Sequence, residues 1–242
     1  MSYDRYQKTL ARMYSAISDD DDNIIYNLVG TGFLIAEQYL LTCAHVIASA
    51  LGIDGKTYEI PQGVVFLDFP FLDFESDSKK NKKFRARVAY WLPEDPHCNQ
   101  VEDIAGLYLL EPLSYKLEPA RMKSIEDFHS LEILKRHHLR IFGFPEVPGK
   151  EAYAVPASAP LANRWIQIQD TYETGPSLKE GFSGSPVWDE QLQGIVGMVL
   201  AKDTEPNRKI AYMIPRRDLP AFENVSLYQL LQKLSEFEHE IY

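Results

Sequence analysis

Three side chains in this sequence have the types and surroundings that nucleophilic catalysis needs. Ser183 lies in the string Gly181-Phe182-Ser183-Gly184, where the glycines permit a tight turn that presents the hydroxyl outward. A serine hydroxyl is a poor nucleophile alone and needs a base to take its proton. His45 carries an imidazole, which can accept a proton near neutral pH and later return it to a leaving group. Asp103 stands at the start of an apolar run and could hold the imidazole in one tautomer.

The glycine-flanked turn also offers backbone donors for a developing negative charge. We expect the N–H groups of Gly181 and Ser183 to form an oxyanion hole, in which loss of one donor typically costs roughly 2.7–4 kcal/mol of transition-state stabilisation. Taken singly, each motif has an ordinary explanation, namely a structural histidine, a capping aspartate and a simple turn. Their joint occurrence in the order His, Asp, Ser is far more specific and favours acyl transfer by a serine nucleophile.

Metal and thiol chemistry fit the sequence less well. His137 and His138 are adjacent, so on a strand they would point to opposite faces. Cys98 follows His97, but no second Cys/His pair completes a zinc site. Amidotransfer or thiol catalysis would need cysteine in the turn that holds Ser183. We therefore expect no metal and no cofactor.

The elements that position these residues are predicted to be β-strands. Short apolar runs, rich in β-branched and aromatic residues, alternate with Gly, Pro, Asn and Asp. Few windows of helical length interrupt them, which disfavours a parallel βαβ architecture and favours antiparallel barrels or sandwiches. The predicted strands cover residues 24–29, 32–35, 38–42, 64–67, 84–91, 104–109, 139–144, 164–168, 194–199 and 211–214.

Helices are predicted at both ends of the chain. Tyr6, Leu10, Met13 and Ile17 recur at helical spacing, so residues 1–22 are interpreted as an N-terminal helix followed by an acidic loop. Residues 221–242 carry leucines on one helical face and form the predicted C-terminal helix. A further helical window over residues 123–137 could join two barrels.

The composition excludes several classes of partner. With 35 acidic and 25 basic residues the net charge is −10, which argues against nucleic acid and against an anionic membrane surface. The sequence shows neither a signal peptide nor a membrane-spanning apolar run. Cys43 and Cys98 are its two cysteines, so a disulfide framework is excluded and a reducing, cytoplasmic setting is predicted. Cys43 is interpreted as a small buried filler.

With these motifs, the chain resembles the trypsin-like (chymotrypsin-fold) serine peptidases. The strings that carry the likeness are Leu41-Thr42-Cys43-Ala44-His45, Asp103-Ile104-Ala105-Gly106-Leu107 and Gly181-Phe182-Ser183-Gly184-Ser185-Pro186. It covers roughly residues 23–219 and implies an all-β, chymotrypsin-like fold of two antiparallel β-barrels with flanking N- and C-terminal helices. The first barrel would span residues 23–120 and carry His45 and Asp103. The second would span residues 121–220 and carry Ser183.

Two finer likenesses point to particular branches of this family. Gly30-Thr31-Gly32-Phe33-Leu34 is similar to the strand that precedes the histidine in the Deg/HtrA-like branch. The wider strings around His45, Ser183 and Gly197 resemble the trypsin-like domains that bacterial defence proteins fuse to sensor or NTPase modules.

The sequence departs from the secreted members of the family at the nucleophile turn, residues 181–184, which carries Ser183. Phe182 stands where those enzymes carry an aspartate that pairs with a new N-terminus after cleavage. Activation by N-terminal trimming is therefore not expected. Gly197 stands where many relatives place a serine that supports the catalytic aspartate, so Asp103 would rely on other hydrogen bonds.

The resemblance also implies a specificity pocket. Its base would lie at Ser177, where the absence of an aspartate argues against a preference for Lys or Arg. We expect cleavage after small or medium apolar residues. The predicted pocket residues are Ser177, Glu180, Gly197, Met198 and Val199.

The predicted function is that of an intracellular serine endopeptidase that cleaves a partner protein with the triad Ser183, His45 and Asp103. By resemblance it would be a regulated effector of a bacterial antiviral defence or signalling system, controlled by a sensor or NTPase module in cis or in trans. The alternative is a catalytically silent trypsin-fold module used for protein binding. A complete triad argues against that alternative.

Overall fold

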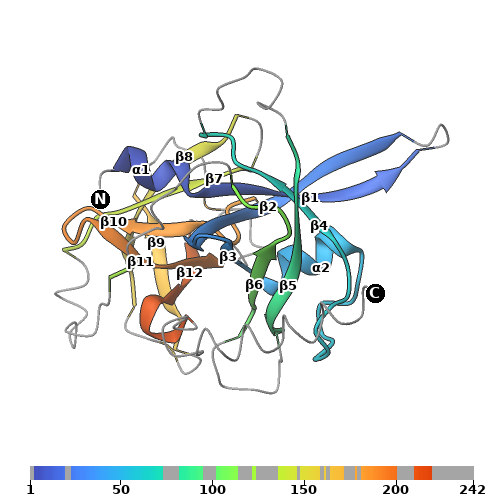
Figure 1. Cartoon of the computed structure of the whole chain (residues 1–242). Helices are drawn as coiled ribbons and strands as arrows, with labels where there is room; N and C mark the ends of the chain where they lie inside the picture. The colour runs from blue at the N-terminus through green and yellow to red at the C-terminus, as the bar shows by residue number, and fades with distance from the viewer. Residues whose placement is uncertain are drawn as a thin grey trace.

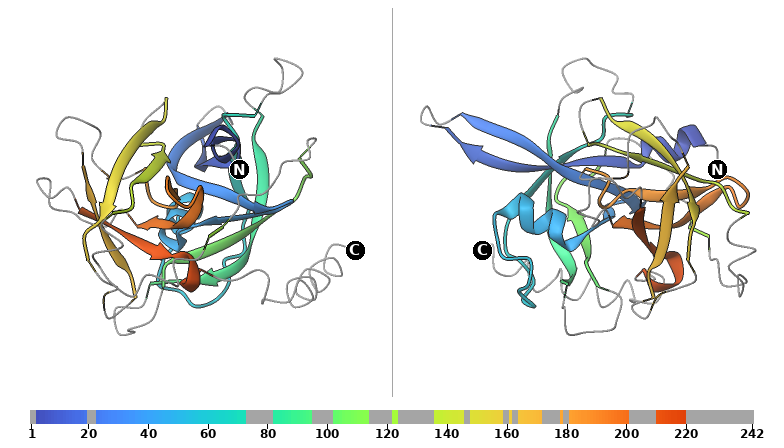
Figure 2. Two further views of the ribbon diagram at one scale, coloured as in Figure 1. Left: turned by 90° about the vertical axis from the view of Figure 1, so that its left-hand side faces the viewer. Right: turned by 180° about the vertical axis from the view of Figure 1, so that it is seen from behind.

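Two closed antiparallel β-barrels of six strands each lie side by side in the computed structural model (Figures 1 and 2). The structure describes residues 3–19, 23–72, 82–94, 102–113, 122–123, 136–145, 148–158, 161, 164–171, 178, 181–200 and 210–219. The predicted all-β class with two antiparallel barrels is confirmed.

The first barrel has the strand order β1-β2-β3-β6-β5-β4. Its strands are β1 (Leu10–Ser18), β2 (Ile24–Ala36), β3 (Tyr39–Thr42), β4 (Val65–Asp68), β5 (Phe84–Leu92) and β6 (Ile104–Leu109). In β5, buried Phe84, Ala86 and Val88 alternate with exposed Arg85 and Arg87, as expected for a strand with one face in a core. Helix α2 (Ala44–Leu51) follows β3 and packs against β1 and β2.

The second barrel has the order β10-β11-β12-β9-β8-β7. Its strands are β7 (Leu139–Gly143), β8 (Lys150–Pro156), β9 (Ile166–Asp170), β10 (Pro186–Asp189), β11 (Gly194–Leu200) and β12 (Ile210–Pro215), followed by the 3-10 helix η2 (Arg216–Asp218). The sequence patterns missed β8, which mixes charged residues with a terminal proline, and the four-residue β10.

The interpretation of residues 1–22 as a helix is wrong for most of its length. Helix α1 covers only Tyr3–Lys8, and Leu10–Ser18 is strand β1 of the first barrel. The first barrel therefore begins before residue 23. The spacing of Leu10 and Met13 is helical, but β1 pairs with β2 on one side and β4 on the other, and both of its faces are buried near Leu10 and Met13. These long-range ladders outweigh a weak local preference for helix.

Helix α1 docks on the second barrel although its sequence leads into the first (Figure 1). Tyr6 is fully buried, and its hydroxyl donates to the carbonyl of Pro186 at 2.8 Å. Its ring packs against Trp188, with centroids 5.4 Å apart. The Tyr3 hydroxyl donates to Glu151, and the Arg140 guanidinium stacks 3.6 Å from the centre of the Tyr3 ring. Helix α1 therefore packs on the second barrel, while strand β1, which follows it, belongs to the first.

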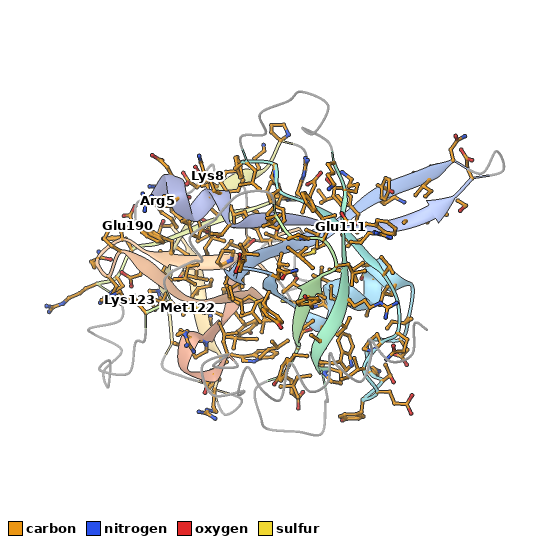
Figure 3. All side chains as sticks on the ribbon, viewed as in Figure 1. Arg5, Lys8, Glu111, Met122, Lys123 and Glu190 are labelled. Atoms are coloured by element: carbon orange, nitrogen blue, oxygen red, sulfur yellow. The ribbon has the colours of Figure 1, made fainter. Side chains whose placement is uncertain are left out.

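The apolar core is continuous across the junction of the barrels, and side chains fill both interiors (Figure 3). The cluster inside the first barrel extends to Phe144, Trp188, Met198 and Ile214 of the second. A separate cluster, which includes Phe182, fills the second barrel. Such a shared core fixes the barrels relative to each other, which a site built from both of them requires.

Some predicted elements lie outside the described residues. These are the C-terminal helix over residues 221–242 and most of the helical window over residues 123–137. Lys123 itself lies beside β11, where its N–H donates to the carbonyl of Ile195 at 2.7 Å (Figure 3). Among the described residues, no helix has the length and apolar character needed to span a bilayer.

Candidate active site

His45 lies in the first turn of α2, directly after β3. Cys43 is the N-cap residue of this helix, and Gly52 ends it in the left-handed conformation with φ +65°, its N–H donating to the carbonyl of Ala48. Glycine is the usual residue for such a helix end. The His45 side chain is 37% exposed, so its ring reaches solvent while its backbone is anchored on the barrel.

Asp103 reaches His45 because of the register between β3 and β6. These strands pair antiparallel with Thr42 opposite Ala105, so the end of β3 meets the start of β6. Asp103 precedes β6 with φ +68°, an uncommon conformation that aspartate tolerates better than most residues. Because β3 continues into α2, this corner brings the buried carboxylate next to the imidazole.

The carboxylate of Asp103 holds His45 at two points. Its Oδ2 lies 2.7 Å from the His45 Nδ1, and its Oδ1 accepts the backbone N–H of His45 at 2.9 Å. Asp103 is fully buried. Two bonds from one buried carboxylate fix both the position and the rotation of the imidazole, and leave Nε2 as the nitrogen available for proton transfer.

Ser183 lies in a tight turn that begins at Gly181 and leads into β10. Gly181 and Gly184 have φ +90° and φ +82°, and the N–H of Ser185 donates to the carbonyl of Phe182 at 2.9 Å. Phe182 points into the core of the second barrel and is fully buried. The glycines therefore shape the turn as the sequence predicts, while Phe182 anchors it by apolar packing.

The segments that carry His45 and Ser183 meet at the junction of the barrels. The carbonyl of Val199 on β11 accepts both the thiol of Cys43, at 3.3 Å, and the N–H of Gly184, at 3.0 Å. Gly30 on β2 also lies close to both the helix that carries His45 and the turn that carries Ser183. A Cβ at Gly30 would stand 2.8 Å from the methyl groups of Val46 and 3.4 Å from the carbonyl oxygen of Ser183. The structure thus places Asp103 against His45 and brings their segment next to the turn that carries Ser183.

The N–H groups of the predicted oxyanion hole have no hydrogen-bond acceptor among the described residues. There, neither the N–H of Gly181 nor that of Ser183 donates a hydrogen bond, whereas the N–H groups of Gly184 and Ser185 do. This difference fits a turn in which two donors are kept for a ligand.

One group of potential metal ligands occurs among the described residues, and it overlaps the candidate site. The ligand atoms of Cys43, His45 and Asp103 all lie within 4.8 Å of one another. The Asp103 carboxylate already holds the imidazole, and the Cys43 thiol donates to Val199. Each donor atom therefore has a role that needs no metal.

The predicted pocket residues on β11 lie directly behind the nucleophile turn, with the N–H of Val199 donating to the carbonyl of Ser185 at 2.8 Å. The side chains of Met198 and Val199 are fully buried. Gly197 has no space beside it, because a Cβ there would lie 2.5 Å from the carbonyl oxygen of Ile214. A serine at that position would not fit without movement. Ser177 and Glu180 lie outside the described residues.

Sequence reasoning gave no role to Thr31, although it contacts the nucleophile turn. Thr31 stands between Gly30 and Gly32 on β2. A glycine inside a strand often marks a place where another backbone approaches closely, and two glycines around one threonine were the signal available.

The chain matches known proteins in sequence and in fold. A family model described as a trypsin-like peptidase domain matches residues 30–198. Among solved structures, an HtrA-type protease, AlgW with a tripeptide, matches with a TM-score of 0.60 at 16% sequence identity. The match covers 93% of this chain and 62% of the AlgW chain, so this chain spans less than two thirds of the length of AlgW. At this sequence identity the likeness is one of fold. A search of curated proteins found no match.

Proposed function

Because this chain belongs to the family of trypsin-like peptidase domains, we propose that it is a serine endopeptidase that hydrolyses peptide bonds with Ser183 as the nucleophile. His45 is the general base and acid, and Asp103 is its orienting carboxylate. The observation that carries this assignment is the two-point contact of Asp103 with the ring and the backbone of His45.

The reaction follows from these roles. Nε2 of His45 takes the proton of the Ser183 hydroxyl while Oγ attacks the carbonyl carbon of the scissile peptide. The carbonyl oxygen becomes an oxyanion that the N–H groups of Gly181 and Ser183 stabilise. The imidazolium then gives its proton to the leaving amine, which departs and leaves an acyl-enzyme. A water molecule, deprotonated by His45, attacks the ester, and collapse of the second oxyanion releases the acid and restores Ser183.

The proposed substrate is a protein or peptide that presents a small or medium apolar residue to the pocket of Ser177, Glu180, Gly197, Met198 and Val199. The sequence supports this preference, since Ser177 stands where a basic preference would need an aspartate. The AlgW protease of similar fold was solved with a tripeptide, which supports a peptide as the ligand class. A peptide-library profile dominated by Lys or Arg would contradict the preference.

The proposed setting is intracellular, as a regulated effector of a bacterial defence or signalling system that acts under a sensor or NTPase module. The two cysteines of the chain support a reducing compartment. The likeness of the strings around His45 and Ser183 to defence-associated domains supports the role. Neighbouring genes that encode an NTPase or a repeat sensor would support control by such a module. Detection of the protein outside the cell would contradict the intracellular setting.

The proposed activity is tested with a fluorophosphonate probe, which reacts with an activated serine. Wild type should be labelled at Ser183 and should cleave a casein or peptide-library substrate. Ser183→Ala should lose both while keeping its unfolding transition. Asp103→Asn should remain folded but lose turnover by about 10⁴-fold, because the amide favours the wrong imidazole tautomer. Cleavage that persists in Ser183→Ala would refute the assignment, and a wild type that neither labels nor cleaves would favour the silent binding module.

A further inference from the structure

Thr31 connects the first barrel to the nucleophile turn of the second through its backbone and its side chain. It is fully buried on β2. Its N–H donates to the carbonyl of Ser183 at 3.0 Å, and its hydroxyl donates to the carbonyl of Gly181 at 2.8 Å. Each of these contacts crosses from one barrel to the other, so both carbonyls are held by an element that is independent of the turn itself.

The Thr31 hydroxyl both donates and accepts a hydrogen bond, which restricts its direction. Besides donating to Gly181, its Oγ1 accepts the N–H of Phe144 at 3.2 Å, and that N–H also lies 3.1 Å from the carbonyl oxygen of Gly181. The carbonyl of Thr31 accepts the hydroxyl of Thr42 at 2.6 Å, three residues before His45. A buried hydroxyl that serves one acceptor and one donor is restricted in its rotamer.

These bonds control the orientation of peptide planes in the turn. A peptide group is rigid, so holding its carbonyl also sets the direction of its N–H. Thr31 holds the peptide that follows Gly181 and the peptide that follows Ser183. The peptide between Phe182 and Ser183, which carries the predicted oxyanion donor of Ser183, lies between these two. The carbonyl of that middle peptide accepts the N–H of Ser185 at 2.9 Å, so Thr31 fixes the backbone on both sides of the donor, while Ser185 holds the peptide that carries it.

We propose that Thr31 is a positioning residue, which sets the oxyanion hole and the Ser183 nucleophile from the opposite barrel. The inference rests on the proposed serine-peptidase function. Gly30, the neighbour of Thr31 on β2, also approaches the turn, since a Cβ there would stand 3.4 Å from the carbonyl oxygen of Ser183.

Two substitutions separate the hydroxyl from the shape of the side chain. Thr31→Val keeps the branched shape and loses the hydroxyl, whereas Thr31→Ser keeps the hydroxyl. A misplaced oxyanion donor loses part of its stabilisation, so Thr31→Val should lower kcat and the rate constant of fluorophosphonate labelling by about tenfold or more. KM should stay near the wild-type value, and Thr31→Ser should restore the labelling rate.

The amplitude of labelling distinguishes positioning from simple destabilisation. If Thr31 only stabilises the fold, Thr31→Val lowers the fraction of molecules labelled and leaves the rate constant of the folded ones unchanged. Positioning predicts full amplitude at a reduced rate. If Thr31→Val does not fold, the same labelling experiment is done with Thr31→Ala. That variant also lacks the hydroxyl and places no methyl group against the Gly181 carbonyl.

Failure of this inference and failure of the proposed function give different results. Wild type that labels at Ser183, together with Thr31→Val that labels at the same rate, overturns the role of Thr31 and leaves the peptidase intact. Wild type that does not label overturns the proposed function, on which the role of Thr31 depends.

Discussion

Tyr6 and Pro186 are joined by a hydrogen bond of 2.8 Å from the tyrosine hydroxyl to the proline carbonyl. Pro186 lies three residues after Ser183 and begins β10. The first helix of the chain therefore touches the strand that leaves the nucleophile turn. Burial raises the pKa of Tyr6, so its hydroxyl stays protonated and remains a donor over the pH range of a peptidase assay.

Loss of this contact should lower activity as well as stability. Tyr6→Phe keeps the ring on Trp188 and removes the hydroxyl, which should cost about 1 kcal/mol of unfolding free energy. We expect kcat to fall because the end of the nucleophile turn loses a support. Deletion of residues 1–8 should lower activity further, whereas activation by trimming predicts a gain. Urea unfolding and peptide hydrolysis measure the two effects.

Tyr14→Phe is the matched control for Tyr6→Phe. The Tyr14 hydroxyl donates to Asp68 at 3.1 Å within the first barrel, away from the nucleophile turn. This variant should lose stability and keep its kcat. Equal effects of the two substitutions on kcat would show that Tyr6 acts through global stability alone.

Gly184→Ala should disable the site. The residue has φ +82°, and an added Cβ would stand 2.1 Å from the carbonyl oxygen of Thr31 and 2.4 Å from the Thr42 hydroxyl oxygen. Gly52→Ala is the control, because Gly52 has φ +65° with nothing within 4 Å of an added Cβ. The control should cost about 1–2 kcal/mol from left-handed strain and retain activity. Thermal unfolding and probe labelling of both variants test this, and an active Gly184→Ala would contradict the close packing.

Phe182→Ala should destabilise the second barrel and disorder the nucleophile turn. Removal of a fully buried phenylalanine typically costs about 3–5 kcal/mol. Phe182→Leu, which keeps apolar volume beside Gly143, should lose less and retain part of the activity. Denaturant unfolding and the rate of fluorophosphonate labelling are measured for both variants. A stable, fully active Phe182→Ala would mean that the turn does not depend on this anchor.

Glu151 should make the docking of α1 sensitive to acid. Burial opposes ionisation, but hydrogen bonds from Tyr3 and Tyr153 and the charge of Arg140 lower the pKa of Glu151 below its ordinary value. A lowered folded-state pKa stabilises the fold above the unfolded-state pKa, and this contribution is lost as pH falls through the folded-state pKa. Glu151→Gln should therefore be less stable than wild type near neutral pH, with the difference shrinking in acid. A difference that does not change with pH would contradict this account.

The sequence was most informative where chemistry and local pattern coincide. The contact of His45 with Asp103 and the glycine turn at Ser183 could be predicted because the proposed chemistry restricts the residue types and their order. Most strands could be predicted because their apolar runs are short and bounded by turn residues. Strand β1 was missed because its partners β2 and β4 come later in the chain, so no local spacing distinguishes it from a helix. The contacts of Thr31 depend on the register between barrels, which no single segment encodes.

The partners of the nucleophile turn have a consequence for biosynthesis. Tyr6 and Pro186 are 180 residues apart, Cys43 and Val199 are 156 apart, and Thr31 and Gly181 are 150 apart. A nascent chain that has emerged only through β6 already holds His45 and Asp103 but lacks Ser183. Contacts of such long sequence separation form late. The proposed peptidase activity should thus appear only after the second barrel has been translated and has closed onto the first.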